Sequence, residues 1–243
     1  EFNALAMLAL VAVVTGVFAV SSNTMSIGIL AMAGAYIAPA FALKTAGPQA
    51  VSGYYVAISA LSLVMVTLRG WRGLIHLSFL FTIAGAVFFG WTAKFYRPEH
   101  YAVMQPLLLA LAALHLAMPL VERRHLPSRW LSRFDVVYFV ALPLFSAALM
   151  LLIAPDWRVQ GALGLALLAA IWGITAGILK ALKRDEALRH ALVSTLLLVA
   201  ALLCRLDDVP WLLLGLGLGV AMLALAPRLG WQKSSQELTC GGI

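Results

Sequence analysis

Nine long apolar stretches, separated by short gaps, constrain this chain more than any other feature of its sequence. A helix that crosses a membrane needs about 20 mostly apolar residues. Because lipid offers the backbone no hydrogen-bond partner, such a stretch is expected to form a helix that satisfies its own peptide groups. The predicted membrane spans are residues 4–20, 25–43, 49–68, 73–93, 101–121, 134–154, 159–180, 189–204 and 209–226.

The composition agrees with a chain that lies mostly in lipid. Of the 243 residues, 63% are hydrophobic and 11% are charged, whereas soluble domains carry about 25% charged residues. No gap is long enough to hold a soluble domain. We therefore predict an all-α integral membrane protein, a bundle of about nine transmembrane helices with short loops. The prediction is one transmembrane domain over residues 1–226, followed by a cytoplasmic C-terminal tail over residues 227–243.

The basic residues are divided unequally between the two sides of the membrane that nine spans define. Twelve of the 17 lysines and arginines fall on the side of the C-terminus, and five fall on the other side. Cytoplasmic loops carry the excess of lysine and arginine in membrane proteins. We therefore expect the C-terminus in the cytoplasm, residue 1 outside, and a further span upstream of residue 1. The net charge of +7 is attributed to lipid contact, and nucleic acid is not expected as a partner.

The second predicted span combines small residues with a tyrosine and a proline. Gly28 is one of several small residues that allow close approach of neighbouring helices in lipid. Pro39 has no backbone N–H, so it removes a helical hydrogen bond and kinks the helix. One interpretation is a tightly packed structural helix. The other is a kink that opens a cavity or substrate path lined by Tyr36, together with Tyr54 and Tyr55 of the third span.

Two histidines are predicted at similar depths in adjacent spans. His76 lies about one turn into the fourth span, and His115 lies under two turns from the end of the fifth span on the same side. At 1.5 Å per residue these depths are roughly 5 and 10 Å. Ionisable residues inside a membrane are candidates for a functional site. The alternative is a pair of neutral histidines that bond to backbone or to each other, since a metal site usually needs three or four ligands.

Acidic residues and enzyme motifs provide no catalytic candidate. All ten aspartates and glutamates lie in gaps, tails or span ends, whereas proton-coupled carriers commonly place one near mid-membrane. The Ala-Val-Ser-Gly stretch at 50–53 faintly resembles a protease nucleophile motif, but His76 lies near the opposite end of the membrane from Ser52. The sequence therefore predicts no catalytic residue, no metal ligand and no cofactor.

The longest gap, residues 122–133, is also the most basic. Its arginines, and those that follow the third span, are predicted to contact anionic lipid headgroups, each worth about 1 kcal/mol near the surface. A docking loop for a partner membrane protein, or a homo-oligomer, is the other interpretation of this gap. The predicted lipid contacts are Arg69, Arg72, Arg123, Arg124, Arg129 and Arg133.

The second and third spans resemble a known family, the predicted membrane proteins catalogued as domain of unknown function 2339. A Leu-Gly-Gly-Phe-x-x-Pro-like pattern of that family is matched by Ala33, Gly34, Ala35, Tyr36 and Pro39. A basic residue followed by Gly-Trp-Arg is matched by Arg69, Gly70, Trp71 and Arg72. The resemblance covers roughly the first half of the chain. It implies a polytopic protein of the bacterial inner membrane with a role in the envelope, and it brings no established reaction.

Three functions follow from these observations. The favoured hypothesis is a non-enzymatic envelope component that acts as a structural or accessory subunit. The first alternative is a transporter or flippase for a lipid or small apolar solute, with a cavity around the kinked second span. The second alternative is a membrane-embedded enzyme that acts on a lipid or lipid-linked substrate through His76 or His115.

Overall fold

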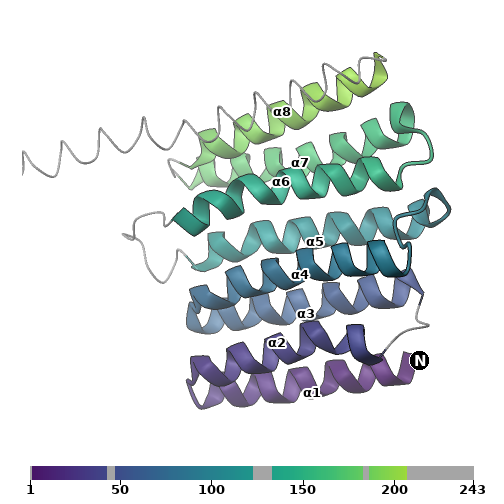
Figure 1. Ribbon diagram of the computed structural model, residues 1–243. Helices are drawn as coiled ribbons and strands as arrows, with labels where there is room; N and C mark the ends of the chain where they lie inside the picture. The colour runs from purple at the N-terminus through teal and green to yellow at the C-terminus, as the bar shows by residue number, and fades with distance from the viewer. Residues whose placement is uncertain (1, 43–46, 123–132, 183–185, 207–243) are drawn as a thin grey trace, which may run out of the picture. The chain divides into compact units, whose positions relative to one another are not determined.

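The computed structural model describes residues 2–42, 47–122, 133–182 and 186–206, and all regular elements in these ranges are helical (Figure 1). Within these ranges, side chains are described for all residues except 2–5, 41–42, 122 and 133–136. Two short elements, the 3-10 turn η1 (Pro98–His100) and the π turn η2 (Trp157–Gly161), precede helices. The α-helices are α1 (Phe2–Ser21), α2 (Met25–Ala42), α3 (Pro48–Arg69), α4 (Arg72–Thr92), α5 (Tyr101–Glu122), α6 (Arg133–Ile153), α7 (Ala162–Ala181) and α8 (Ala187–Arg205).

The first eight predicted spans are confirmed as apolar helices, and the ninth, residues 209–226, lies outside the described residues together with the tail. In α1, α2 and α6 the apolar stretch whose side chains are described is shorter than 18 residues. These stretches are Ala6–Ser21, Met25–Ala40 and Val137–Ile153. By length and composition, five described helices can cross a membrane, and these are Pro48–Arg69, Arg72–Thr92, Pro98–Val121, Trp157–Ala181 and Ala187–Arg205.

Local sequence signals explain where α3 begins and ends, and where the helical structure before α7 begins. Pro48 occupies the first turn of α3, where its missing N–H leaves no helical hydrogen bond unmade. Gly70 ends α3 with a φ of 65°, and its N–H donates to the carbonyl of Val66, as is typical of a left-handed C-cap. Asp156 accepts a hydrogen bond from the N–H of Arg158 over 2.9 Å, so helical structure begins at η2, slightly before the predicted start at residue 159.

The helices group into two compact units, which we describe separately. Unit 1 comprises Glu1–Tyr138 and Ala148–Pro155, and unit 2 comprises Phe139–Ala147 and Asp156–Ile243. Helix α6 therefore supplies residues to both units. The predicted single domain over residues 1–226 extends beyond the described part of the chain, so it stays a prediction.

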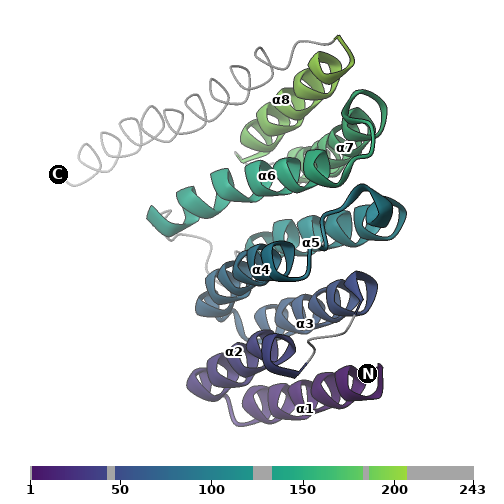
Figure 2. The same cartoon turned by 45° about the vertical axis from the view of Figure 1, so that its right-hand side comes forward.

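In unit 1 the first five helices form two rows. Helices α1, α3 and α5 lie side by side in one row, and α2 and α4 lie in the other (Figures 1 and 2). Sequential helices run antiparallel because their connections are short. The starts of α1, α3 and α5 consequently lie at one end of the unit, together with the loop that joins α4 to α5 (Figure 1).

Two glycines leave room for large aromatic side chains from other segments of unit 1. A Cβ atom at Gly28 would lie 2.7 Å from the indole ring of Trp71, and one at Gly85 would overlap the hydroxyl oxygen of Tyr55. Both approaches are far closer than van der Waals contact. The absence of a side chain at these two positions therefore allows α2 to pack against Trp71 and α4 to pack against α3.

In unit 2, α7 and α8 pack along their length. The Ser194 hydroxyl of α8 donates to the carbonyl of Ala169 on α7 over 2.8 Å. A Cβ atom at Gly173 would lie 3.0 Å from the Ser194 oxygen. Near them, the buried ring of Trp172 contacts His190, with 5.3 Å between ring centroids. A small residue and an interhelical hydrogen bond thus join the two helices at one level, as is common in lipid.

Candidate functional site

Two tyrosines of α3 bind backbone carbonyls of α2 that precede Pro39. Pro39 cannot donate the N–H that would normally bond to the carbonyl of Ala35, four residues earlier. The Tyr54 hydroxyl donates to this carbonyl oxygen over 2.8 Å, and the Tyr55 hydroxyl donates to the carbonyl of Tyr36 over 3.0 Å. Both tyrosines are buried. The backbone acceptor freed by the proline is therefore satisfied by the neighbouring helix.

A second proline in unit 1 has the same kind of partner. Pro119 in α5 lacks the N–H that would bond to the carbonyl of His115, and the Tyr138 hydroxyl of α6 donates to that oxygen over 2.6 Å. In hydrocarbon an unpaired backbone group is destabilising by several kcal/mol. We call these two arrangements the proline–tyrosine joints, at Pro39 with Tyr54 and at Pro119 with Tyr138.

The side chain of Tyr36 forms the centre of a buried hydroxyl cluster, which we define as Tyr36, Ser59 and Ser78. The Tyr36 hydroxyl lies 2.9 Å from the Ser59 hydroxyl on α3 and 2.5 Å from the Ser78 hydroxyl on α4. All three side chains are at most 1% exposed, and the Tyr36 ring stacks on Phe81 with 6.2 Å between centroids. The hydroxyl cluster therefore ties α2, α3 and α4 together at one point in the core of unit 1.

His115 lies beside this region and is itself buried, with 2% of its surface exposed. Its Nε2 atom is 3.1 Å from the Thr82 hydroxyl, one helical turn beyond Ser78 on α4. Its Nδ1 atom has no hydrogen-bond partner in the described part of the chain, and the same holds for the Ser62 hydroxyl, one turn beyond Ser59. The imidazole thus has one partner on a neighbouring helix and one nitrogen that the described residues do not satisfy.

The two histidines border the same pair of aromatic rings. Phe79 and Tyr138 lie 4.5 Å apart by ring centroids. The ring of His115 meets Phe79 edge-on at 5.7 Å, and the ring of His76 meets Tyr138 edge-on at 6.3 Å. The two histidines thus share an aromatic neighbourhood, and His76 is partly exposed whereas His115 is not.

The chemistry of these groups is that of neutral hydrogen bonding. Among the described residues that are buried as a whole, the polar ones besides tyrosine are serines, one threonine and two histidines. The described residues also hold no group of three histidines, cysteines or carboxylates placed to bind a metal ion. Hydroxyl and imidazole groups in this arrangement join helices. Each can form a further hydrogen bond where it has an unused lone pair or proton.

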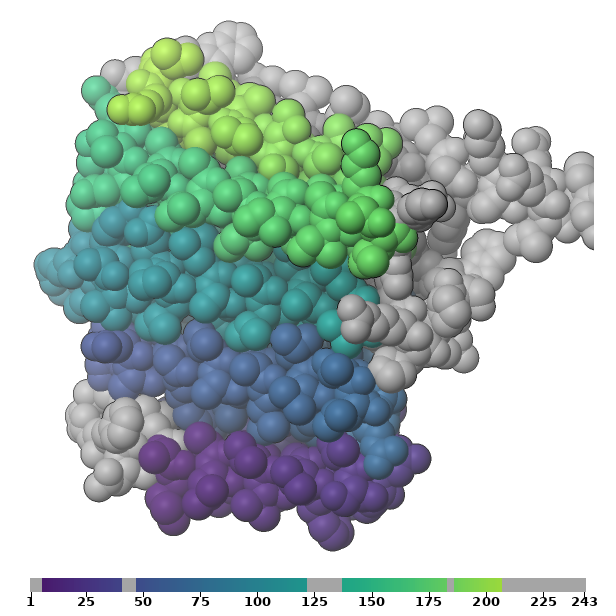
Figure 3. Space-filling view, turned by 180° about the vertical axis from the view of Figure 1, so that it is seen from behind, coloured from purple at the N-terminus to yellow at the C-terminus, as the bar shows by residue number. Residues whose placement is uncertain are grey.

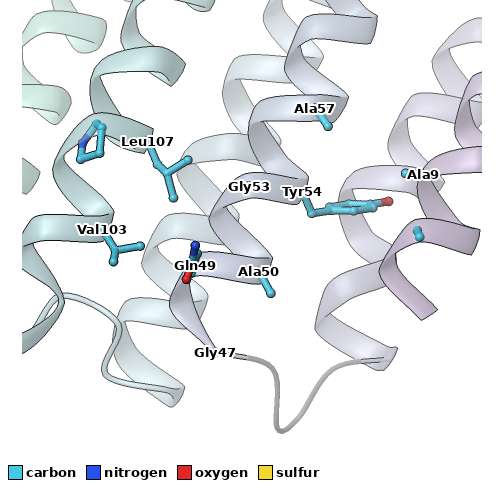
Figure 4. Close-up of a pocket in the computed structure, with 11 residues that line it drawn as sticks. Ala9, Gly47, Gln49, Ala50, Gly53, Tyr54, Ala57, Val103 and Leu107 are labelled. Carbon is cyan, nitrogen blue, oxygen red and sulfur yellow. The ribbon is translucent and has the colours of Figure 1, made fainter. Parts of the chain in front are cut away.

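An open groove lies on the face of unit 1 that α1, α3 and α5 form. Figure 3 shows this face, with α1 in purple, α3 in blue and α5 in teal. Its volume is about 880 Å³, within the range of small-molecule sites. Tyr54 lines it, and Gln49 stands near its end at Gly47 (Figure 4). Of the residues predicted to line a cavity, Tyr54 is thus placed at this groove, while Tyr36 and Pro39 are buried in the core.

The predicted lipid-binding arginines are only partly within the described residues. Arg69 is exposed, and its guanidinium donates to the carbonyl of Val20 at the end of α1, with a distance of 2.9 Å from Nε. A cation at this place also interacts favourably with the negative C-terminal end of the α1 dipole. Arg72 begins α4 and is partly exposed. The side chains of the other four lie outside the described residues, and these are Arg123, Arg124, Arg129 and Arg133.

Sequence reasoning did not select the serines and threonine of the core. Their signal is nevertheless present, because Ser52, Ser59 and Ser62 recur on one face of α3, as Ser78 and Thr82 do on α4. Residues three, four or seven positions apart share one side of a helix. A polar stripe inside an otherwise apolar span indicates the side that faces other helices.

Long apolar helices joined by buried hydroxyls, as in the described part of the chain, are typical of a helical membrane protein. The chain belongs to the family described as Predicted membrane protein (DUF2339), whose model matches residues 1–240. The resemblance seen around the second and third spans is confirmed, and the match extends far beyond the first half of the chain. Comparisons with the curated proteins and with the solved structures gave no match.

Proposed function

We propose that this protein is a non-enzymatic component of the bacterial inner membrane that acts as a structural or accessory subunit of the cell envelope. In this proposal about nine helices cross the membrane, with residue 1 outside and the C-terminus in the cytoplasm. The placement of twelve basic residues on one side and five on the other supports this orientation.

The observation that carries the proposal is the closure of the proline–tyrosine joints. Carriers use broken helices whose unpaired backbone groups line a water-filled cavity and bind substrate or ions. Here the Ala35 carbonyl is bonded to Tyr54 and the His115 carbonyl to Tyr138. With these acceptors already occupied by tyrosines of neighbouring helices, the joints are suited to holding helices together, which is what a structural subunit requires.

The expected partners are membrane lipids with anionic headgroups, and either other membrane proteins or further copies of this chain. The basic gap at residues 122–133 supports lipid or partner contact on the cytoplasmic side. The apolar surface of α1 supports a second kind of contact, within the bilayer, because its side chains are largely exposed over Met7–Phe18.

Cysteine accessibility tests whether the core of unit 1 is closed. The native cysteines are first replaced, as Cys204→Ala and Cys240→Ser, and a single cysteine is introduced as Ser59→Cys or Ser78→Cys. We expect no reaction of either variant with a water-soluble maleimide applied to either side of native membranes, and full reaction after unfolding in detergent. The matched control is Gln49→Cys. Gln49 is exposed at the start of α3, so a cysteine at this position should react without unfolding.

Labelling of the cysteine at position 59 or 78 in intact membranes, with normal thermal stability of the variant, would show that water reaches the hydroxyl cluster. That outcome would contradict a closed structural core. It would favour the carrier hypothesis, in which the kinked second helix lines a substrate path.

A further inference from the structure

We propose that the open groove on α1, α3 and α5 is a binding site for the acyl part of one membrane phospholipid. This goes beyond the proposed function, which names lipids only as surroundings and as partners of the arginines. The groove is a recess in the row of three helices that is open on one side, and its volume is about 880 Å³. Figure 4 shows the residues that line it.

The recess arises from the residues that α3 presents between its two neighbours. Along this side, the first half of α3 carries Ala50, Gly53 and Ala57, which form the floor of the groove. The second half carries Leu61 and Val64 at the equivalent positions. Small side chains thus lower the surface of α3 over its first half, and larger ones fill the corresponding space over its second half.

The walls are apolar and come from the flanking helices. Ala6 and Ala9 line the groove from α1, and Val103 and Leu107 line it from α5. The hydroxyl of Tyr54, which also lines the groove, is already bonded to the Ala35 carbonyl. The interior is therefore suited to hydrocarbon rather than to a sugar, a nucleotide or an ion, each of which needs several polar partners.

The length of the groove matches one leaflet of a bilayer. From Gly47 to Ala57 the helix α3 rises about 15 Å at 1.5 Å per residue, and the hydrocarbon core of a bilayer is about 30 Å thick. A volume of 880 Å³ over this length corresponds to a mean cross-section of roughly 60 Å². A helix at least 10 Å in diameter has a cross-section of about 80 Å², so a lipid tail fits the space better than a whole partner helix.

The polar end of the groove suits a phospholipid headgroup. Gln49 is exposed at this end. The loop between α4 and α5 lies at the same end of unit 1 and carries exposed Lys94 and Arg97, with Glu99 as its acidic residue. With two cations and one anion, the loop has a net positive charge, which favours binding of a phosphate group at headgroup depth. On the orientation proposed above, the lipid belongs to the outer leaflet.

Native mass spectrometry of the full chain tests the site. The purified protein is stripped of lipid in detergent and titrated with phosphatidylglycerol, and the fraction with one bound lipid is measured. Gly53→Leu should fill the groove without disturbing its packing, because a Cβ atom at Gly53 meets nothing within 4 Å. We expect at least a tenfold weaker binding of the first lipid for Gly53→Leu, and a similar loss for Ala57→Leu.

The matched control is Gly34→Leu on α2, where a Cβ atom also meets nothing within 4 Å and which does not line the groove. This variant should bind the first lipid as the wild type does, and all three variants should unfold at similar temperatures. Equal lipid binding by Gly53→Leu, Gly34→Leu and the wild type would overturn the proposal. A wild-type dimer that Gly53→Leu converts to a monomer would also overturn it, since a second copy would then occupy the groove.

Discussion

Replacing Gly85 by alanine is expected to lower the free energy of unfolding by about 2–4 kcal/mol, from overpacking and loss of a hydrogen bond. The added Cβ would overlap the Tyr55 hydroxyl oxygen and would lie 2.5 Å from the ring carbon that bears it. The Tyr55 ring has little room to move, because it packs against Tyr36 and Phe89. Its displacement would also break the bond from its hydroxyl to the Tyr36 carbonyl.

The matched control for Gly85→Ala is Gly34→Ala. Both glycines lie inside helices, but a Cβ atom at Gly34 meets nothing within 4 Å. Alanine is a better helix former than glycine by up to about 1 kcal/mol, so this control should be neutral or slightly stabilising. Thermal or denaturant unfolding in the same detergent measures both variants. Equal stability of the two would show that Tyr55 does not occupy the space beside Gly85.

Removing the Tyr36 hydroxyl has the second largest expected effect. Tyr36→Phe keeps the buried ring but loses the bonds to Ser59 and Ser78. Interhelical hydrogen bonds in membranes contribute about 0.6 kcal/mol on average and up to about 2 kcal/mol. Because two such bonds are lost and two buried hydroxyls lose a partner, we expect a destabilisation of about 1–3 kcal/mol.

Thr15→Val serves as the control for Tyr36→Phe, because among the described residues the Thr15 hydroxyl bonds to carbonyls of its own helix, at Val11 and Ala12. It should change the free energy of unfolding by much less. Ser59→Ala should also be less destabilising in the Tyr36→Phe background than in the wild type, because residues of one network are not additive. A Tyr36→Phe protein as stable as Thr15→Val would contradict the central place of Tyr36 in the cluster.

The helices could be predicted well because each depends on a property that a short stretch of sequence carries. A run of about 20 apolar residues specifies a membrane span. Pro48 and Gly70 mark the two ends of α3 by their effect on the backbone alone. The position of Pro39 likewise predicted a carbonyl without its helical hydrogen bond, because a proline removes that bond wherever it stands in a helix interior.

The partners of these elements could not be predicted in the same way. The polar stripes of α3 and α4 indicate the side that faces other helices, but they do not show which helix lies there or at what depth. Tyr54 and Tyr55 lie 19 residues from the carbonyls that they bind, and His115 lies 33 residues from Thr82. These pairings depend on the rotation and depth of two helices, which follow from packing around residues such as Gly28 and Gly85.

A double-mutant cycle between Pro39 and Tyr54 tests the proline–tyrosine joint most directly. In the wild-type background, Tyr54→Phe should lower the free energy of unfolding by about 1 kcal/mol, because it leaves the Ala35 carbonyl without its partner. In the Pro39→Ala background the alanine N–H can bond to that carbonyl within the helix, so Tyr54→Phe should then have little effect. We therefore expect a coupling free energy of about 1 kcal/mol between the two positions. Additive effects of Pro39→Ala and Tyr54→Phe would contradict the joint, because the tyrosine would then not satisfy the carbonyl that the proline frees.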